Sequence, residues 1–390
     1  MTQRLYYLDS YLRSFEASVV ERAEEGRRIY LDRTAFYPTS GGQLYNTGQL
    51  DGIEVAEVVD EGERVAHFLV EPLVSGPTVL GELNWPRRLD HMQQHTGQHL
   101  LSAVLADLWN YTTTSVHLGE LTSTLDLDTP QLSSEQIAQA EERANQIIAE
   151  NRPVTVTFAD ATTAAGLRKP SSRSGTIRIV AIESLDRSAC GGTHVTATGA
   201  IGAVLVRKLE RVRKGVRLEF LCGIRAVRRS RMESAVLSNL AAELSSSVDE
   251  LPRVVANQRA DVKALSASKR ELEAQLSRYR AQELYASAQP DPAGIRRATV
   301  RLPGGELNEL RGLAQAFADL PRAVFIGSIE TPPSVLLSAA PDSGVDAANV
   351  LKRTVSLAGG RGGGSSTMAQ GVLPGRAQLE QVLSVLEGAK

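Results

Sequence analysis

Apolar and polar positions alternate over short stretches in the first 85 residues. Apolar runs cover residues 17–20, 53–59 and 65–70, and clusters of Gly, Asp and Glu separate them. Short apolar segments divided by turn residues are typical of strands in a small sheet or barrel. The pattern therefore predicts a β-rich segment at the N-terminus.

From about residue 90 the apolar spacing becomes helical. Leucines and valines between residues 100 and 108 recur at that spacing, which predicts a helix from Asp90 to about Asn110, with Asp90 as its N-cap. A second helix is expected over 134–150, because Ser133 and Gln136 have the spacing of a capping box. Residues 154–158 and 177–182 are strand candidates, and 201–209 with 216–221 indicate a hairpin.

Residues 225–283 are charged, and their apolar residues follow a seven-residue repeat. One position of the repeat holds Leu237, Leu244, Leu251, Leu265, Leu272 and Tyr279, with Gln258 in the missing slot, and the companion position holds Val248, Val255, Val262 and Leu276. Such a seam is typical of paired helices. A break is expected near residue 249. The seam could pair within one chain or between two chains, and the sequence does not choose.

The last hundred residues follow a linker signal at 286–292. Apolar runs at 323–326 and 335–339 predict buried strands, and 306–318 and 377–387 predict helices. A glycine-rich segment covers 358–371.

Composition excludes several classes of protein. The 390 residues are 42% hydrophobic and 23% charged with a formal net charge of −2, so no overall basic character marks a nucleic-acid binder. Runs of 18 apolar residues and a signal-peptide pattern are both absent, so no membrane partner is expected. Two cysteines cannot build a disulfide framework. We expect a cytoplasmic protein of two to four domains.

Two motifs carry residues able to bind a metal. His95 and His99 are four positions apart, and so are Cys190 and His194. One thiolate and three imidazoles suit Zn²⁺. His91 shares the helical spacing, so periodicity leaves open whether the helix supplies His91 with His95 or His95 with His99. We interpret Cys222 as a core residue.

Further residues could act on a substrate near such a metal. The loop 34–43 contains Gly41 and Gly42, which would let the backbone approach a ligand closely. His117 is either a fifth ligand, a substrate contact or part of a polar strand edge. Glu120, close by in the sequence, could orient water or take its proton.

Taken in order, segments 34–43, 91–101, 115–120 and 190–194 resemble the editing domain of alanyl-tRNA synthetase, and more closely the freestanding AlaX editing proteins in their long form. Residues 359–371 are similar to the signature of the DHH-associated RNA-binding domain. The resemblance implies one zinc ion per chain, held by His95, His99, Cys190 and His194. It implies catalytic roles for Thr34, Gln43 and Glu120, and substrate binding by Gly41, Gly42, His117, Ser123 and Arg361.

This chain departs from the synthetase pattern at several positions. It has Gln98 where Thr is usual, His117 and Glu120 where a Gln is usual, and Ser365, Ser366 and Thr367 where Arg, Pro and Asp are commoner. Basic clusters that could contact RNA phosphates lie at Arg168, Lys169 and Arg173, and at Arg207, Lys208, Arg211, Arg213 and Lys214.

The expected fold is α+β in four parts. They are a β-barrel domain (1–85), a zinc-containing α/β editing domain (86–224), a coiled-coil-like helical linker (225–288) and a glycine-rich α/β domain of RNA-binding type (289–390). The resemblance implies zinc-dependent deacylation of mischarged tRNA(Ala), chiefly Ser-tRNA(Ala) and also Gly-tRNA(Ala). Because the chain has no room for an aminoacylation domain, we expect it to hydrolyse a charged tRNA and not to make one. The alternatives are a threonyl-type editing protein and a non-catalytic tRNA-binding protein with a structural zinc. A homodimer could form through the helical segment or the C-terminal domain.

Overall fold

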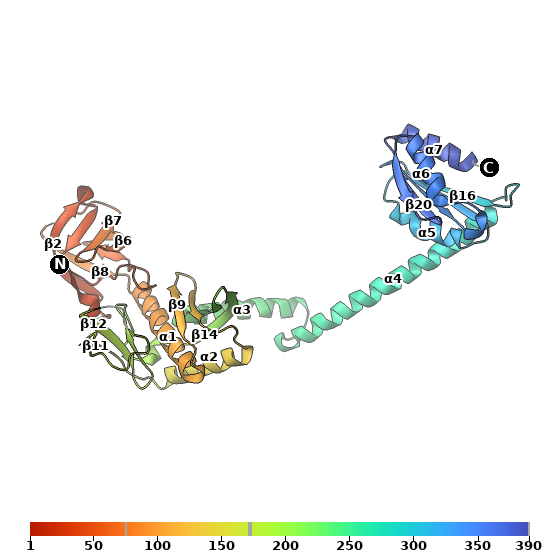
Figure 1. Ribbon diagram of the computed structural model, residues 1–390. Helices are drawn as coiled ribbons and strands as arrows, with labels where there is room; N and C mark the ends of the chain where they lie inside the picture. The colour runs from red at the N-terminus through yellow and green to blue at the C-terminus, as the bar shows by residue number, and fades with distance from the viewer. Residues whose placement is uncertain (75, 171–173, 389–390) are drawn as a thin grey trace. The chain divides into compact units, whose positions relative to one another are not determined.

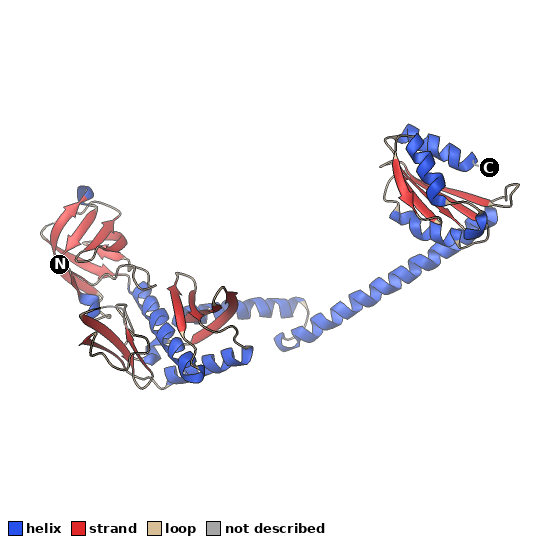
Figure 2. Cartoon of the chain, in the orientation of Figure 1, coloured by secondary structure: helices blue, strands red, loops and turns tan. Residues whose placement is uncertain are grey.

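The computed structural model describes residues 1–74, 76–170 and 174–388 and has a mixed α+β fold, as predicted (Figures 1 and 2). The chain divides into two compact units, Met1–Leu240 and Ala241–Lys390, and each is described by itself. The finer four-part division stays a prediction. No helix in the described part of the chain combines the length and the apolar character needed to cross a lipid bilayer.

A closed six-stranded barrel forms the start of the first unit, which confirms the β-rich prediction. In barrel order its strands are β2 (Ser14–Ala23), β3 (Arg28–Leu31), β7 (Val65–Leu69), β6 (Ile53–Asp60), β5 (Gly48–Leu50) and β8 (Thr78–Leu83). In β8, residues alternate strictly between exposed and buried, so every second residue faces the barrel core. The short strands β1 (Gln3–Arg4) and β4 (Arg33–Thr34) pair in parallel beside the barrel.

One long helix, α1 (Trp85–Trp109), forms the centre of the first unit. Its residues from His91 to Leu105 are all buried. The prediction that this helix begins at Asp90 is wrong. The Asn84 side chain accepts a hydrogen bond from the Arg87 backbone N–H and caps the helix six residues earlier. Asp90 instead binds the Arg225 guanidinium with both carboxylate oxygens, at 2.7 and 2.5 Å.

Two further sheets and two helices complete the first unit. The four-stranded sheet has the order β14 (Val204–Val212), β15 (Gly215–Cys222), β10 (Ser123–Leu127) and β9 (Thr113–Leu118). The three-stranded sheet consists of β11 (Val154–Asp160), β12 (Thr176–Ile182) and β13 (Asp186–Ala189). Helix α2 (Ser134–Ala149) begins with the predicted capping box of Ser133 and Gln136. The β14–β15 hairpin is also as predicted, and α3 (Gly223–Glu243) follows it.

The second unit is a five-stranded sheet with helices on both faces. The strand order is β16 (Arg296–Leu302), β17 (Ala323–Ile329), β18 (Ser334–Ala339), β20 (Met368–Val372) and β19 (Arg361–Gly364). The C-terminal end of α4 (Leu251–Ser287) and helix α5 (Asn308–Ala318) pack with one face, and α6 (Ala347–Leu357) and α7 (Arg376–Gly388) pack with the other. The break predicted near residue 249 is the short 3-10 helix Val248–Glu250 before α4.

Candidate metal centre

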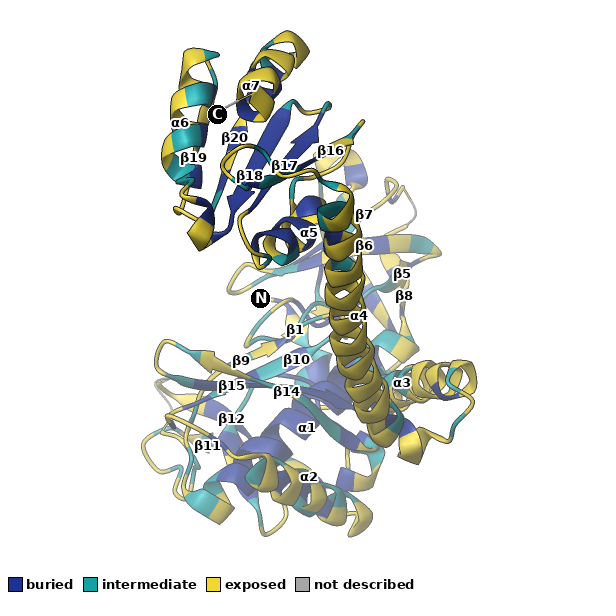
Figure 3. Cartoon of the chain, turned by 90° about the vertical axis from the view of Figure 1, so that its right-hand side faces the viewer, coloured by how far each residue is buried: buried dark blue, intermediate teal, exposed yellow. Residues whose placement is uncertain are grey.

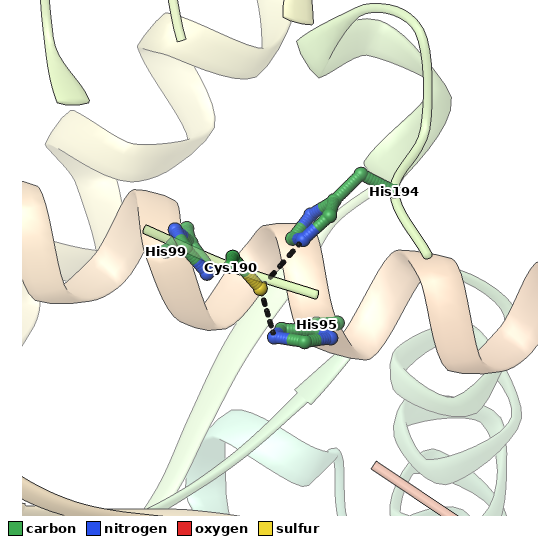
Figure 4. A group of neighbouring side chains, drawn as sticks. All are labelled: His95, His99, Cys190 and His194. Atoms are coloured by element: carbon green, nitrogen blue, oxygen red, sulfur yellow. Dashed lines mark hydrogen bonds between the residues drawn. The ribbon is translucent and has the colours of Figure 1, made fainter. Parts of the chain in front are cut away.

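Four side chains that could hold a metal ion converge inside the first unit. His95 and His99 come from α1, and Cys190 and His194 come from the segment that follows β13 (Figure 4). One ligand atom from each residue lies within 4.8 Å of all the others. Cys190 Sγ is 3.4 Å from His95 Nε2 and 3.3 Å from His194 Nε2. A tetrahedral zinc site would separate sulfur and nitrogen ligands by about 3.5 Å, so the four residues fit this ion.

The structure favours His95 with His99 over His91 with His95 as the helical pair. His91 is buried outside the cluster, and its Nδ1 has no partner among the described residues. Cys222 is fully buried, and burial raises its pKa, so it is a core residue as interpreted.

A second layer of polar groups orients each of the three imidazoles. His95 Nδ1 donates to Gln43 Oε1 at 2.8 Å, and His99 Nδ1 donates to Asp186 Oδ2 at 2.9 Å. His194 Nδ1 lies 3.1 Å from Thr96 Oγ1. Because Nδ1 of every ring is engaged in this way, Nε2 is left to bind a metal. Such outer partners fix the tautomer and orientation of metal-binding histidines.

The loop that carries Cys190 is held by backbone contacts and by small residues. Arg178 donates from one guanidinium nitrogen to the carbonyl oxygens of Cys190 (2.8 Å) and Gly192 (2.9 Å), and from Nε to the carbonyl of Tyr7 (3.0 Å). A Cβ atom at Gly192 would overlap the His95 ring, so glycine lets this backbone pass directly beside a ligand.

Electrostatics favour the metal-binding form of the cysteine. Burial alone would raise the pKa of Cys190, but its interactions with His95 and His194 hold that pKa well below the ordinary value. Burial lowers the pKa of His194 to about 3. For His99, burial opposes the charged form, yet the hydrogen bond to Asp186 and the neighbouring Cys190 raise its pKa to about 9. The thiolate is the form of cysteine that binds metals.

The cluster opens into a cavity of about 410 Å³. Tyr37, Ser40 and Gly41 line it from the barrel side, and His95 and Gln98 line it from α1. The Gln98 Nε2 donates to Ser102 Oγ at 2.8 Å, whereas its Oε1 has no hydrogen-bond partner among the described residues. Gln98 therefore places an amide group, whose oxygen is free to accept a hydrogen bond, at the wall of the cavity next to the metal ligands.

The loop residues expected from the sequence lie at different depths. Gly41 lines the cavity, and Gly42 packs against the backbone of Val116. Gln43 accepts a hydrogen bond from His95, so it is in direct contact with one of the metal-binding residues. Thr34 is fully buried and does not line the cavity; its hydroxyl lies 2.8 Å from His67 Nε2 and accepts from the Phe36 N–H.

The remaining expected residues do not join the cluster. His117 is exposed, and Glu120, whose side chain is 67% exposed, pairs with Arg87. Ser123 is buried, with no partner for its hydroxyl in the described regions. Arg361 belongs to the second unit, and Arg173 lies outside the described residues.

Sequence reasoning missed Asp186, Thr96, Arg178 and the amide oxygen of Gln98 that has no partner among the described residues. Thr96 and Gln98 stand inside the His95–His99 motif, where the helical pattern drew attention to the histidines alone. In the sequence, Asp186 is 87 positions from His99 and Arg178 is 12 positions from Cys190, and no spacing rule would connect them with these ligands.

Comparisons relate this chain to known proteins. The family model for the threonyl and alanyl tRNA synthetase second additional domain matches residues 177–218, which include Cys190 and His194. An alanine–tRNA ligase of Pyrococcus abyssi is 30% identical over 410 positions, covering 99% of this chain and 44% of that protein. The alanyl-tRNA editing protein Aarsd1 of Bos taurus is 35% identical over 241 positions, covering 56% of this chain and 54% of that protein.

The chain is therefore homologous to alanyl-tRNA editing proteins and alanine–tRNA ligases. It spans about half the length of these curated relatives. A solved structure, the C-Ala domain from Aquifex aeolicus alanyl-tRNA synthetase, aligns with 24% of this chain and 88% of that domain at 18% identity. Its TM-score of 0.22 is too low to define a shared fold.

Proposed function

We propose that this protein hydrolyses the ester bond of mischarged tRNA(Ala), chiefly Ser-tRNA(Ala) and also Gly-tRNA(Ala). The observation that carries the proposal is the buried cluster of His95, His99, Cys190 and His194 at the wall of a cavity. The homology to proteins named for alanyl-tRNA editing supports the same reaction.

The residues of the cluster suit one Zn²⁺ per chain, which when bound would activate water or polarise the ester carbonyl. Gln43, Asp186 and Thr96 hold the imidazoles in place. Cys190 is half-buried whereas the three histidines are buried, so we propose Cys190 as the exchangeable ligand. Glu120 pairs with Arg87 and does not line the cavity, so the proposal gives it no proton-transfer step.

We propose that Gln98 distinguishes seryl from alanyl esters. Its free Oε1 can accept a hydrogen bond from the serine hydroxyl, and an alanyl group would leave this oxygen unpaired. A site that hydrogen-bonds a hydroxyl can reject the analogue that lacks it by large factors. Thr34, for which the resemblance implies a catalytic role, reaches a substrate only if its hydroxyl gives up the bond to His67.

Binding of tRNA would come from basic residues near the cavity and on the β14–β15 turn that have no ion-pair partner among the described residues. Lys169 lines the cavity, and Arg211, Arg213 and Lys214 line a surface hollow at the turn. Arg207 and Lys208 are engaged by Glu219 and Glu210, so they are weaker candidates. Arg361, on the glycine-rich strand β19, would add a phosphate contact from the second unit if that unit also binds tRNA.

The test measures release of serine and of alanine from tRNA(Ala) charged with each, by the full chain and by His95→Ala. We expect fast serine release, slow alanine release, and loss of serine release in the variant and after metal chelation. A wild-type protein that holds zinc and releases neither amino acid would refute the proposal. The remaining alternatives would be a non-catalytic tRNA-binding protein and a threonyl-type editing protein. Release of serine from tRNA(Thr) would distinguish the second from the first.

A further inference from the structure

One wall of the cavity carries a chain of three polar side chains, Gln98, Ser102 and Thr113. The first two stand one turn apart on α1, which Figure 3 draws largely in the colour of buried residues, and Thr113 begins β9. Ser102 Oγ lies 2.8 Å from Gln98 Nε2 and 2.8 Å from Thr113 Oγ1. Gln98 and Thr113 line the cavity, whereas Ser102 is fully buried and does not. A hidden hydroxyl therefore connects two groups that a substrate can reach.

The buried hydroxyl of Ser102 needs an acceptor for its own proton, and this need limits how the chain is connected. Among the described residues, Ser102 Oγ has no hydrogen-bond partner other than Gln98 and Thr113. If it accepted from both, its O–H would stay unpaired in the interior, which is costly. Ser102 therefore accepts from one neighbour and donates to the other.

Both directions of the chain leave the cavity with one donor and one acceptor. When Ser102 accepts from Gln98 and donates to Thr113, the cavity meets the Gln98 Oε1 and the free O–H of Thr113. When Ser102 donates to Gln98, the amide is rotated, and the cavity meets its NH2 group and the free oxygen lone pair of Thr113. Amides and hydroxyls supply both roles, so only the proton positions and the amide orientation differ. The wall always offers a matched pair.

We propose that Thr113 recognises the serine hydroxyl of the substrate together with Gln98, with Ser102 as the positioning residue that keeps their roles complementary. The inference rests on the proposed function, which supplies the seryl ester as ligand. Gln98 Nε2 and Thr113 Oγ1 are each 2.8 Å from the same oxygen, so they are at most twice that distance apart. One hydroxyl that bonds to two partners can span this separation.

The matched pair selects a hydroxyl over other groups. A serine hydroxyl donates and accepts at once, so it satisfies both ends of the chain. An ammonium group only donates and a carbonyl oxygen only accepts, so each satisfies one end. An alanyl methyl group at this position satisfies neither, and a site built to hydrogen-bond a hydroxyl rejects the analogue that lacks it. Thr113 would therefore add to the selectivity that Gln98 provides.

The first test measures binding and not hydrolysis. The probes are seryl-adenosine and alanyl-adenosine in which an amide replaces the ester bond, titrated calorimetrically into the metal-loaded full chain. We expect the wild type to bind the seryl probe at least about tenfold more tightly than the alanyl probe. Thr113→Val should lose about tenfold in affinity for the seryl probe and nothing for the alanyl probe, because one of two hydrogen bonds to the hydroxyl is removed. Thr113→Ser keeps the hydroxyl and is expected to bind as the wild type does.

Thr114→Val is the matched control. Thr114 follows Thr113 on the same strand and lines the same cavity, but its hydroxyl donates to the Asp126 carbonyl at 3.2 Å and has no contact with Ser102. We expect wild-type affinity for both probes in this variant. An equal loss of seryl affinity in Thr113→Val and Thr114→Val would overturn the proposal.

Ser102→Ala tests the connection itself, because Ser102 does not line the cavity. We expect this variant to lose affinity for the seryl probe and to keep its affinity for the alanyl probe, since Gln98 and Thr113 are no longer held in complementary roles. Loss of affinity for both probes would show a merely structural role. Metal content and circular dichroism check that each variant keeps its zinc site and its fold.

The outcomes separate this inference from the proposed function. A wild type that binds the two probes equally, or binds neither, would overturn the recognition of the hydroxyl. A wild type that prefers the seryl probe through Thr113 but releases no serine from Ser-tRNA(Ala) would keep the recognition and refute the hydrolysis alone.

Discussion

Replacing Thr96 by valine tests whether the second layer of polar groups sets metal affinity. Thr96 is fully buried on α1, and its hydroxyl receives the Val195 N–H at 3.2 Å and lies 3.1 Å from His194 Nδ1. Valine has the same shape and leaves both donors without an acceptor. Each buried donor left unpaired costs about 1–3 kcal/mol, so the two donors together predict a loss of about 2–6 kcal/mol in the free energy of unfolding.

The loss of metal affinity is a separate quantity. Removing the outer partner of a metal-binding histidine typically costs 10–100-fold in affinity, which corresponds to about 1.4–2.8 kcal/mol. We expect Thr96→Val to weaken zinc binding by about this factor, measured by competition with a chromophoric chelator. Thr96→Ser keeps the hydroxyl and is expected to retain wild-type affinity.

Thr198→Val is the matched control. Thr198 is also fully buried, and its hydroxyl accepts from the Arg152 N–H and donates to the Ile147 carbonyl, both at 2.8 Å. Both variants remove a threonine hydroxyl and leave two buried backbone or ring groups unpaired. Only Thr96 contacts a metal ligand, which is His194. We expect similar destabilisation and unchanged zinc affinity in Thr198→Val. Equal zinc affinities for both variants would refute the role given to Thr96.

Three further predictions concern single residues. Gln98→Leu should raise the ratio of alanine release to serine release, measured on separately charged tRNA(Ala), and an unchanged ratio would exclude Gln98 as the selecting group. Gly192→Ala should abolish zinc binding, measured by metal content after dialysis, because the new methyl group overlaps the His95 ring. Burial lowers the pKa of His67 from 6.5 to about 4, so its neutral form stabilises the fold fully above pH 6.5, and about 3 kcal/mol is lost as pH falls to 4. In urea unfolding, the difference in free energy of unfolding between wild type and His67→Gln should shrink as the pH falls from 6.5 to 4. A constant difference would contradict the lowered pKa of His67.

Features of the fold that depend on neighbouring residues could be read from the sequence. The capping box at Ser133 and Gln136, the β14–β15 hairpin and the break before α4 each arise from local chemistry, and each is present. The start of α1 could not be read in this way. Asp90 has the residue type of an N-cap, but a contact with Arg225, 135 positions away, engages it instead. A tertiary ion pair outweighed a local preference.

The candidate site shows the same limit. Spacing alone found residues able to bind a metal, but it left two possible helical pairs: His91 with His95, or His95 with His99. The packing of α1 decides between these pairs. Thr34 and Glu120 were expected near the substrate from a motif match. Whether a side chain reaches the cavity depends on its partners, which are His67 for Thr34 and Arg87 for Glu120. No pattern along the chain contains that information.

The barrel is part of the metal centre, because it supplies a hydrogen bond that one ligand needs. Gln43 belongs to the loop between β4 and β5, yet its Oε1 receives both the His95 ring N–H and the backbone N–H of Thr193. A single amide thus joins the barrel loop, the metal-binding helix and the loop of Cys190. Without the barrel, the His95 Nδ1 would lose its acceptor, and the ring would be free to turn Nε2 away from the other ligands. Metal affinity and the shape of the cavity are therefore coupled through Gln43, and a substrate that displaces the barrel loop would act on both.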